Sequence, residues 1–129
     1  MILAIDLGKR TTGIAISESF LASPYKTLTH TSEKEALAKI NAEISDLGAK
    51  TIVIGFVEGK IKPFFENFAR QLQVANPDAK IVLIDETLTS RQATEQMVKL
   101  QVAKHKRQEK EHEVAAALIL QSYLDEQGG

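Results

Sequence analysis

The stretch that decides the fold is residues 1–17, Met-Ile-Leu-Ala-Ile-Asp-Leu-Gly-Lys-Arg-Thr-Thr-Gly-Ile-Ala-Ile-Ser. Two short apolar runs, residues 2–5 and 13–16, are joined by a turn that contains glycine and threonine. This pattern is typical of a β-hairpin. Asp6 would then lie at the end of the first strand, where a rigid scaffold can hold a charge at a surface cleft. Such a position suits a metal ligand, although an aspartate before a turn also commonly caps backbone N–H groups.

Length and composition narrow the class of protein. A chain of 129 residues suits one domain, and we expect residues 1–129 to form it. We expect no signal peptide, and no apolar run approaches the roughly 20 residues of a membrane span. The absence of cysteine excludes disulfides and thiolate metal sites. We therefore expect a cytoplasmic protein with no membrane partner. Because the net charge is -1, any binding to nucleic acid must depend on a local basic patch.

Beyond the hairpin, the apolar pattern alternates between strand and helix periods. We expect a third strand within 20–29, helices at about 32–47, 61–74 and 89–100, buried strands at 51–55 and 80–85, and a last helix from 111 to about 126. Residues 101–110 are polar, basic and poorly periodic, and we expect a mobile loop there. Strands followed by alternating helices and strands predict a mixed α/β fold with right-handed parallel crossovers.

Three of the expected strands end in residues suited to chemistry: Asp6, Gly55, and the pair Asp85-Glu86. In open α/β sheets, ligands bind outside the carboxyl ends of the strands. If the first strand lies beside the fourth or fifth, Asp6 and one carboxylate of the later pair meet in a single cleft. Facing carboxylates repel unless a proton or a cation intervenes, and a hard ion such as Mg²⁺ would relieve the repulsion. The plainer alternative is that residues 85–90 are a strand end followed by a helix cap.

At these places the sequence resembles the YqgF/RuvX family, small proteins described as Holliday junction resolvases and as nucleases of precursor 16S ribosomal RNA. The shared motifs are Asp6-Leu-Gly8 with Gly13-Ile-Ala15, Gly55, Asp85-Glu86-Thr-Leu-Thr-Ser90 with Ala93, and Val114-Ala-Ala-Ala-Leu-Ile-Leu-Gln-Ser-Tyr-Leu124. The resemblance covers almost the whole chain. It implies a ribonuclease H-like fold, with a mixed five-stranded sheet of antiparallel opening strands and then parallel strands, flanked by helices.

The resemblance also implies a catalytic metal site. Asp6 and Glu86 take the positions of two metal ligands, whereas the family's third carboxylate falls on His112. Imidazole binds Mn²⁺ and related ions, but Mg²⁺ prefers oxygen. Glu111 or Glu113 are the alternatives for this place, and because a helix turns by about 100° per residue, only one of the three can point into the cleft.

The expected phosphate contacts are basic side chains. We assign this role to Lys9, Arg10, Lys104, Lys106 and Arg107. By default, the lysines and the arginine of 104–110 form a solvated surface. The resemblance shows two departures from the family's basic residues, Thr11 and Thr87, and these leave substrate affinity or catalytic rate in question.

The sequence thus predicts an endonuclease that uses Mg²⁺ or Mn²⁺, cuts RNA and processes the 5′ end of precursor 16S ribosomal RNA. His112 would be a third ligand or a general base. The alternatives are a nucleic-acid-binding protein with weakened catalysis, and a Holliday junction resolvase that acts on branched DNA. A resolvase would need a symmetric dimer to make paired cuts, and the sequence leaves monomer and homodimer open.

Overall fold

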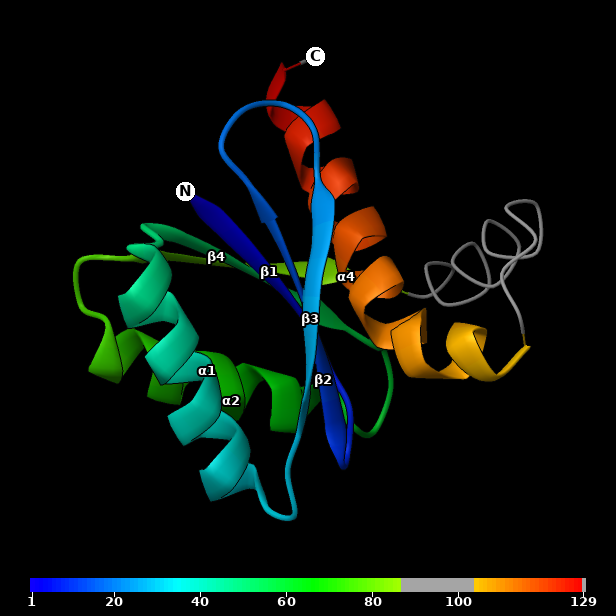
Figure 1. The fold of residues 1–129 in the computed structure, drawn as a ribbon. Helices are drawn as coiled ribbons and strands as arrows, with labels where there is room; N and C mark the ends of the chain where they lie inside the picture. The colour runs from blue at the N-terminus through cyan, green and yellow to red at the C-terminus, as the bar shows by residue number, and fades with distance from the viewer. Residues whose placement is uncertain (87–103, 129) are drawn as a thin grey trace.

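The computed structural model describes residues 1–86 and 104–128. Its centre is a five-stranded sheet with the strand order β3-β2-β1-β4-β5, drawn in Figure 1. The strands are β1 (Ile2–Leu7), β2 (Thr11–Ser17), β3 (Ser23–Thr29), β4 (Thr51–Phe56) and β5 (Lys80–Asp85). The first three strands pair antiparallel, whereas β4 runs parallel to β1, and β5 runs parallel to β4. This topology confirms the predicted mixed sheet.

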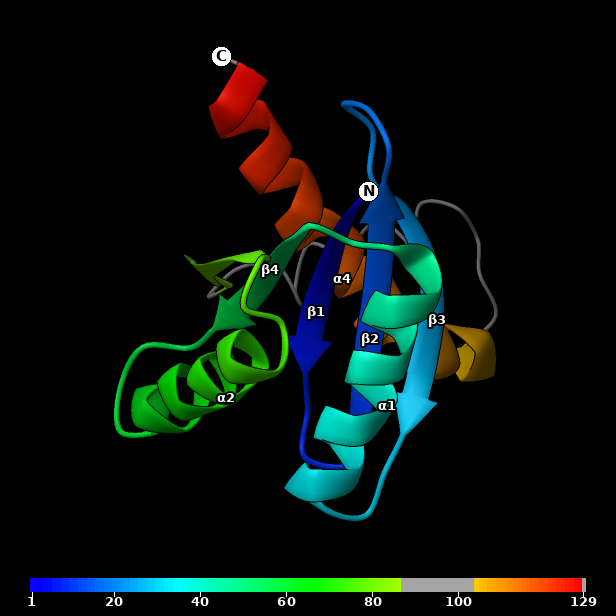
Figure 2. The same cartoon turned by 90° about the vertical axis from the view of Figure 1, so that its left-hand side faces the viewer.

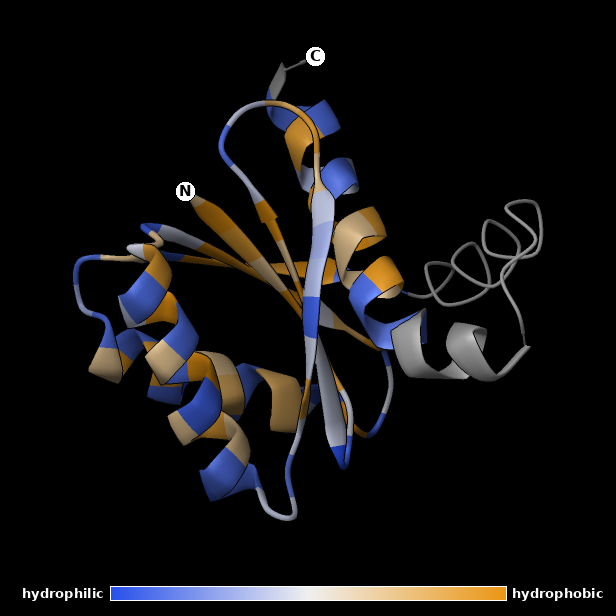
Figure 3. Ribbon diagram, viewed as in Figure 1, coloured by the Kyte–Doolittle hydropathy of each residue, from blue (hydrophilic) through white to orange (hydrophobic). Residues whose placement is uncertain are grey.

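Helices cover both faces of this sheet. Helices α1 (Glu33–Leu47) and α2 (Lys62–Ala75) pack on one face, and α4 (Lys104–Gly128) crosses the other (Figures 1 and 2). Central strands buried on both faces need nearly continuous apolar runs, which appear as orange ribbon in Figure 3. The apolar runs that predicted the strands are therefore the ones that the helices enclose.

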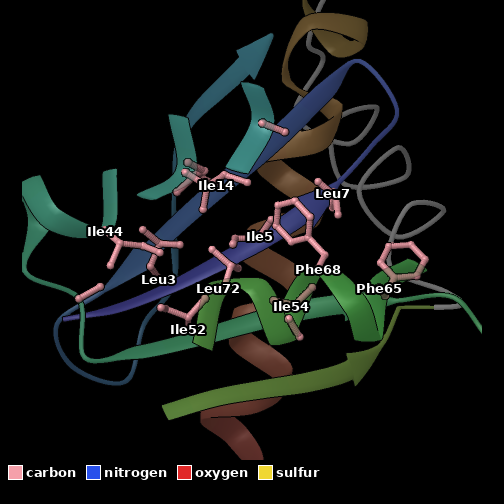
Figure 4. Packing of buried hydrophobic residues seen from close by; sticks show 14 residues of the cluster. Leu3, Ile5, Leu7, Ile14, Ile44, Ile52, Ile54, Phe65, Phe68 and Leu72 are labelled. Atoms are coloured by element: carbon pink, nitrogen blue, oxygen red, sulfur yellow. The ribbon is translucent and has the colours of Figure 1, made fainter. Parts of the chain in front are cut away.

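The two faces differ in the size of their side chains. Large residues such as Leu3, Ile5 and Phe68 fill the core against α1 and α2, as Figure 4 shows. On the opposite face, Ala4 and Ala15 pack against Ala116 and Ala117 of α4. Small residues on both sides let a helix approach a sheet closely. This close approach brings the N-terminal half of α4 to the end of β1.

Local sequence explains the ends of α1. Ser32 is the N-cap, and its hydroxyl accepts a hydrogen bond of 3.1 Å from the Glu35 amide. Gly48 ends the helix with a φ of 65°, a left-handed conformation that favours glycine. These two residues set the bounds of α1.

The prediction of a mobile loop over 101–110 is wrong for 104–110, because these residues form the first turns of α4. Lys, Arg, Gln and Glu lose little rotamer freedom in a helix, so a polar run of them can remain helical without an apolar stripe. Periodicity cannot detect such a segment. Three other predictions lie outside the described residues: residues 101–103 of that loop, the helix expected at 89–100, and the substitution at Thr87. Within the part of the chain that the structure describes, no helix is long and apolar enough to cross a membrane.

Candidate active site

Asp6 is a buried carboxylate near the carboxyl end of β1, with 5% of its surface exposed. The following turn is closed by its own backbone, since the Gly8 N–H donates to the Thr11 carbonyl at 2.8 Å. On the neighbouring strand, the residue opposite Asp6 is Gly13. The Asp6 carboxylate projects toward α4, the side on which Ala4, two residues earlier, also packs.

His112 of α4 is the partner of Asp6. Its Nδ1 lies 2.9 Å from Asp6 Oδ2. An ionised carboxylate only accepts hydrogen bonds, so Nδ1 carries the proton and the other ring nitrogen, Nε2, remains for a second interaction. The His112 side chain is 36% exposed, against 7% for that of Asp6, so the pair opens to solvent on the side of α4.

Gly13 makes this pairing possible. A Cβ atom built on Gly13 would overlap the backbone carbonyl of His112 and the amide of Glu113. Any larger residue at this position would push α4 away from β2, and the imidazole would no longer reach Asp6. Gly13 of the opening motif therefore leaves the space in which the backbone of α4 packs against β2.

Glu86 reaches the same place from the other side. It directly follows β5, and its amide donates to the Phe56 carbonyl of β4 at 2.8 Å. Strand β4 separates β5 from β1, so the side chain must cross it. Gly55 of β4 leaves the space for that crossing, because a Cβ atom there would stand 2.5 Å from Glu86 Oε2. The expectation that Asp6 meets one carboxylate of the 85–86 pair is confirmed for Glu86.

The electrostatics follow from this convergence. Burial raises the pKa of Glu86 to about 8, and the charge of Asp6, a hydrogen bond with it and the charge of Asp85 act in the same direction. The hydrogen bond to Asp6 also raises the pKa of His112, against the effect of burial. At neutral pH, a proton held by Glu86 therefore relieves the repulsion between the two facing carboxylates.

The three candidate residues at the start of the last helix have different partners. His112 faces Asp6, whereas Glu113 Oε2 accepts a hydrogen bond from the Thr27 hydroxyl of β3 at 3.2 Å. The charge of Glu111 raises the pKa of His112. Neighbours on a helix point in different directions, and here only the imidazole points to the carboxylates.

A divalent cation would fit between Asp6 and Glu86, because its charge would offset both the burial of Glu86 and the repulsion between the two carboxylates, which together raise the pKa of Glu86. Among residues 1–86 and the described part of α4, no group of three or more His, Asp or Glu side chains is arranged as a complete metal site. Because Nδ1 of His112 is hydrogen-bonded to Asp6, Nε2 is the ring nitrogen that can bind an ion. The arrangement is thus two carboxylates and a histidine that orients one of them.

The structure describes the side chains of only some of the predicted phosphate contacts. Lys9 and Arg10 are exposed on the turn between β1 and β2, three and four residues beyond Asp6. Thr11 begins β2 and is half-buried. For Lys104, Lys106 and Arg107 the structure describes the helical backbone alone. The turn is therefore the basic element that the structure places next to the carboxylates.

Two positioning contacts were not foreseen from the sequence. The Nε2 atom of buried His30 pairs with the Thr12 hydroxyl at 2.8 Å. Gln121 of α4 holds the loop between β2 and β3, since it accepts from the Ala22 amide and donates to the Phe20 carbonyl. Both contacts join residues distant in sequence, and neither residue type carries a periodic pattern that would reveal them.

Known proteins resemble the chain both in sequence and in fold. Residues 1–126 match the RuvX family, described as Holliday junction resolvase. A protein of Roseiflexus sp. (strain RS-1), named "Putative pre-16S rRNA nuclease", is 33% identical, and the match covers 98% of this chain and 94% of the relative. A relative of the same name from Acetivibrio thermocellus is 32% identical over 98% of this chain and 96% of its own length.

Solved structures extend the likeness to the fold. Thermus thermophilus RuvC in complex with a Holliday junction substrate has a TM-score of 0.54 at 14% identity, with 100% of this chain and 97% of that chain covered. The fowlpox virus resolvase bound to Holliday junction DNA has a TM-score of 0.59 at 10% identity, over 98% and 97% of the two chains. The family match and the curated relatives extend over nearly the whole sequence, and the chain therefore belongs to the RuvX family.

Proposed function

We propose that the protein is a metal-dependent nuclease that hydrolyses RNA, with the 5′ end of precursor 16S ribosomal RNA as its substrate. The observation that carries this proposal is the meeting of Asp6 and Glu86 across Gly55 at the carboxyl edge of the sheet. The curated relatives, named as nucleases of this RNA, support the choice of substrate.

Asp6 and Glu86 would hold the metal through their carboxylate oxygens, which are the ligands that Mg²⁺ prefers. When bound, Mg²⁺ or Mn²⁺ would activate the attacking water and stabilise the charge on the leaving oxygen of the phosphodiester. In-line attack would leave a 3′-hydroxyl and a 5′-phosphate. Both carboxylates are at least nine-tenths buried, so their orientation is fixed before substrate binds.

His112 orients Asp6 through Nδ1 and leaves Nε2 for either the metal or the attacking water. Histidine ligands commonly donate their second ring N–H to a carboxylate, which is the geometry seen here. Because the pair is open to solvent on its helix side, a water can reach His112. We propose that Nε2 completes the metal site or accepts the proton of the nucleophilic water.

Lys9 and Arg10 would contact phosphates that flank the cleaved bond. Their turn follows Asp6 directly, so a strand of RNA that places one phosphate at the carboxylates passes over these cations. The basic residues at the start of α4, namely Lys104, Lys106 and Arg107, would add contacts further along the strand.

The test is cleavage of a labelled RNA that carries the precursor 5′ extension, with Mn²⁺, with Mg²⁺ and with EDTA. We expect metal-dependent cleavage by the wild type and none by Asp6→Asn. Bound but intact RNA under all three conditions would contradict the nuclease and support the alternative, a nucleic-acid-binding protein with weakened catalysis. The replacement of a third carboxylate by His112 and of a basic residue by Thr11 favours that alternative.

Branched DNA is the second candidate substrate, because the matching family is described as a Holliday junction resolvase. A labelled four-way junction therefore belongs in the same experiment. Paired, symmetric cuts in the junction, together with a homodimer in solution, would favour the resolvase. Cleavage confined to RNA by a monomer or a dimer would favour the ribosomal substrate.

A further inference from the structure

A cavity of about 250 Å³ lies at the carboxyl end of β1, on the sheet face opposite to that of Asp6. Its wall is formed in part by the turn after Asp6 and in part by α1 and α2. The residues that matter for its chemistry are Leu7, Gly8, Lys9, His30, Ala36 and Phe64. The proposed metal site does not use this space.

Gly8 connects the cavity with the candidate active site. It lines the cavity, and a Cβ atom built on it would lie 3.4 Å from Cε1 of His112. The backbone of one residue thus separates the imidazole beside the carboxylates from the cavity on the other face. The cavity and the carboxylates therefore lie on either side of the same turn.

The lining suits a flat aromatic ligand with polar edges. The Phe64 ring is half-buried and faces Phe68 at a centroid distance of 6.4 Å and an angle of 40°. Leu7 and fully buried Phe68, which share this end of the core in Figure 4, supply apolar walls. A nucleobase can stack on such a ring, since every base has an apolar face.

Polar groups stand at the border of this apolar space. Lys9 is exposed on the turn, where its ammonium can meet a phosphate. His30 forms part of the wall, is 4% exposed, and has no hydrogen-bond partner for Nδ1 among the described residues. A buried polar atom without a partner needs an explanation, and a base edge that reaches this wall would supply one.

We propose that this cavity binds the base of a nucleotide next to the cleaved phosphodiester, drawn out of its strand or taken from an unpaired end. The base stacks on Phe64 while Lys9 holds the adjoining phosphate. The proposal rests on the proposed nuclease function, and it adds that the substrate is single-stranded at this nucleotide. A fully paired duplex keeps its bases stacked inside and cannot fill the cavity without flipping one out.

Binding is tested without metal or cleavage, by following backbone amide shifts in nuclear magnetic resonance spectra. We expect AMP, titrated to millimolar concentration, to shift the amides of residues 7–9 and 31–36. Ribose 5-phosphate, which lacks the base, is expected to leave those of 31–36 unchanged. Equal shifts with both compounds would show a phosphate site only and would overturn the proposal, as would the absence of any shift with AMP.

Three variants localise the binding. Ala36→Leu fills the cavity, because Ala36 lines it, and is expected to abolish the AMP shifts. Phe64→Leu removes the ring and is expected to weaken binding by about 10-fold, in line with the loss of one base–aromatic stack. The matched control is Ala69→Leu, which enters a different cavity between α2 and β5 and should bind AMP like the wild type. Normal binding by a folded Phe64→Leu would contradict the proposal even if Ala36→Leu failed to fold.

Cleavage gives the second readout and separates the two proposals. An RNA with an abasic nucleotide beside the cleaved bond should be cut by the wild type with at least about 10-fold lower kcat/KM. Phe64→Leu should show little further loss on this substrate. If no RNA is cut although AMP binds as described, the nuclease function fails and the base pocket stands. If RNA is cut regardless of the missing base, the pocket fails alone.

Discussion

Gly13 of β2 and His112 of α4 touch so closely that a single added carbon on the glycine would occupy the place of the histidine carbonyl. This contact sets the distance between the last helix and the first hairpin. Since His112 Nδ1 lies 2.9 Å from Asp6 Oδ2, the same contact determines whether the imidazole meets the carboxylate. The Asp6–His112 pair thus depends on a residue that has no functional group.

Gly13→Ala adds one carbon atom, yet it should strongly lower both the stability of the protein and the rate of metal-dependent cleavage. We expect a loss of roughly 1–3 kcal/mol in the free energy of unfolding, because the extra carbon overpacks the interface between helix and sheet. We also expect about a 100-fold fall in metal-dependent cleavage, as for other displacements of catalytic groups by about 1 Å. Urea unfolding and a cleavage assay measure the two effects.

The control for this variant is Gly48→Ala. At Gly48 the φ of 65° strains any side chain, but nothing lies within 4 Å of the added carbon. It should cost about 1 kcal/mol of stability and leave cleavage intact. Equal activity of both variants would show that the contact between Gly13 and α4 does not position His112.

Glu86→Gln should stabilise the metal-free protein at alkaline pH while it abolishes cleavage. The folded-state pKa of about 8 lies above the ordinary value of 4.5, so the folded state binds more protons than the unfolded state between these values. Stability therefore falls as the pH rises through this window. Glutamine keeps the neutral form and removes the fall.

The measurement is chemical unfolding in EDTA at pH 6 and at about pH 9, beyond the upper pKa. We expect the variant to gain more than about 1 kcal/mol over the wild type between these conditions. Adding Mn²⁺ should raise the thermal midpoint of the wild type far more than that of the variant. A metal-induced rise of the same size in both proteins would remove Glu86 from the metal site.

His112→Asp should change the preference for metal. A carboxylate in place of imidazole favours Mg²⁺, so the ratio of cleavage rates in Mg²⁺ and Mn²⁺ should rise by about 10-fold over the wild type. In EDTA the variant should be less stable, because its new charge faces Asp6 without the hydrogen bond of the histidine. An unchanged ratio would assign His112 to proton transfer or positioning rather than metal binding.

Because His30 is buried, we expect the free energy of unfolding to fall in weak acid. Burial lowers its pKa from the ordinary 6.5, so the unfolded state takes up a proton first as the pH falls. This contribution to stability is complete above pH 6.5 and is lost below it, as the pH falls toward the folded-state pKa. His30→Gln can still bond to Thr12 but does not titrate.

The check is the difference in unfolding free energy between pH 7.5 and 5.5, where the wild type should lose more than His30→Gln. The titrations of Glu86 and His112 are common to both proteins and cancel in this comparison. Equal losses would mean that His30 is as accessible to protons in the folded state as in the unfolded state.

Most of the sheet could be predicted from the sequence, because buried strands need apolar runs that are visible in one dimension. The strand ends predicted that Asp6 meets either Asp85 or Glu86, and the family resemblance selected Glu86. The roles of Gly13 and Gly55 could not be predicted, because they depend on the atoms that occupy the space of the absent side chains. These atoms belong to residues far along the chain, and only the folded register brings them together.

The last helix shows the other limit. Residues 104–110 have good intrinsic helix propensity but no apolar stripe, so a method that depends on burial reads them as a loop. In the same helix, the departure at His112 was visible in the sequence, whereas its hydrogen bond with Asp6 was not. A change of residue type can be seen in a sequence, but its partner depends on the angle at which the helix docks.

The Asp6–His112 pair joins positions that are 106 residues apart. During synthesis, the hairpin with Asp6 leaves the ribosome before the helix that carries His112. A nascent chain can therefore form this hairpin before the imidazole is available to pair with Asp6. Docking of α4 on the sheet is thus the folding step that assembles the proposed active site.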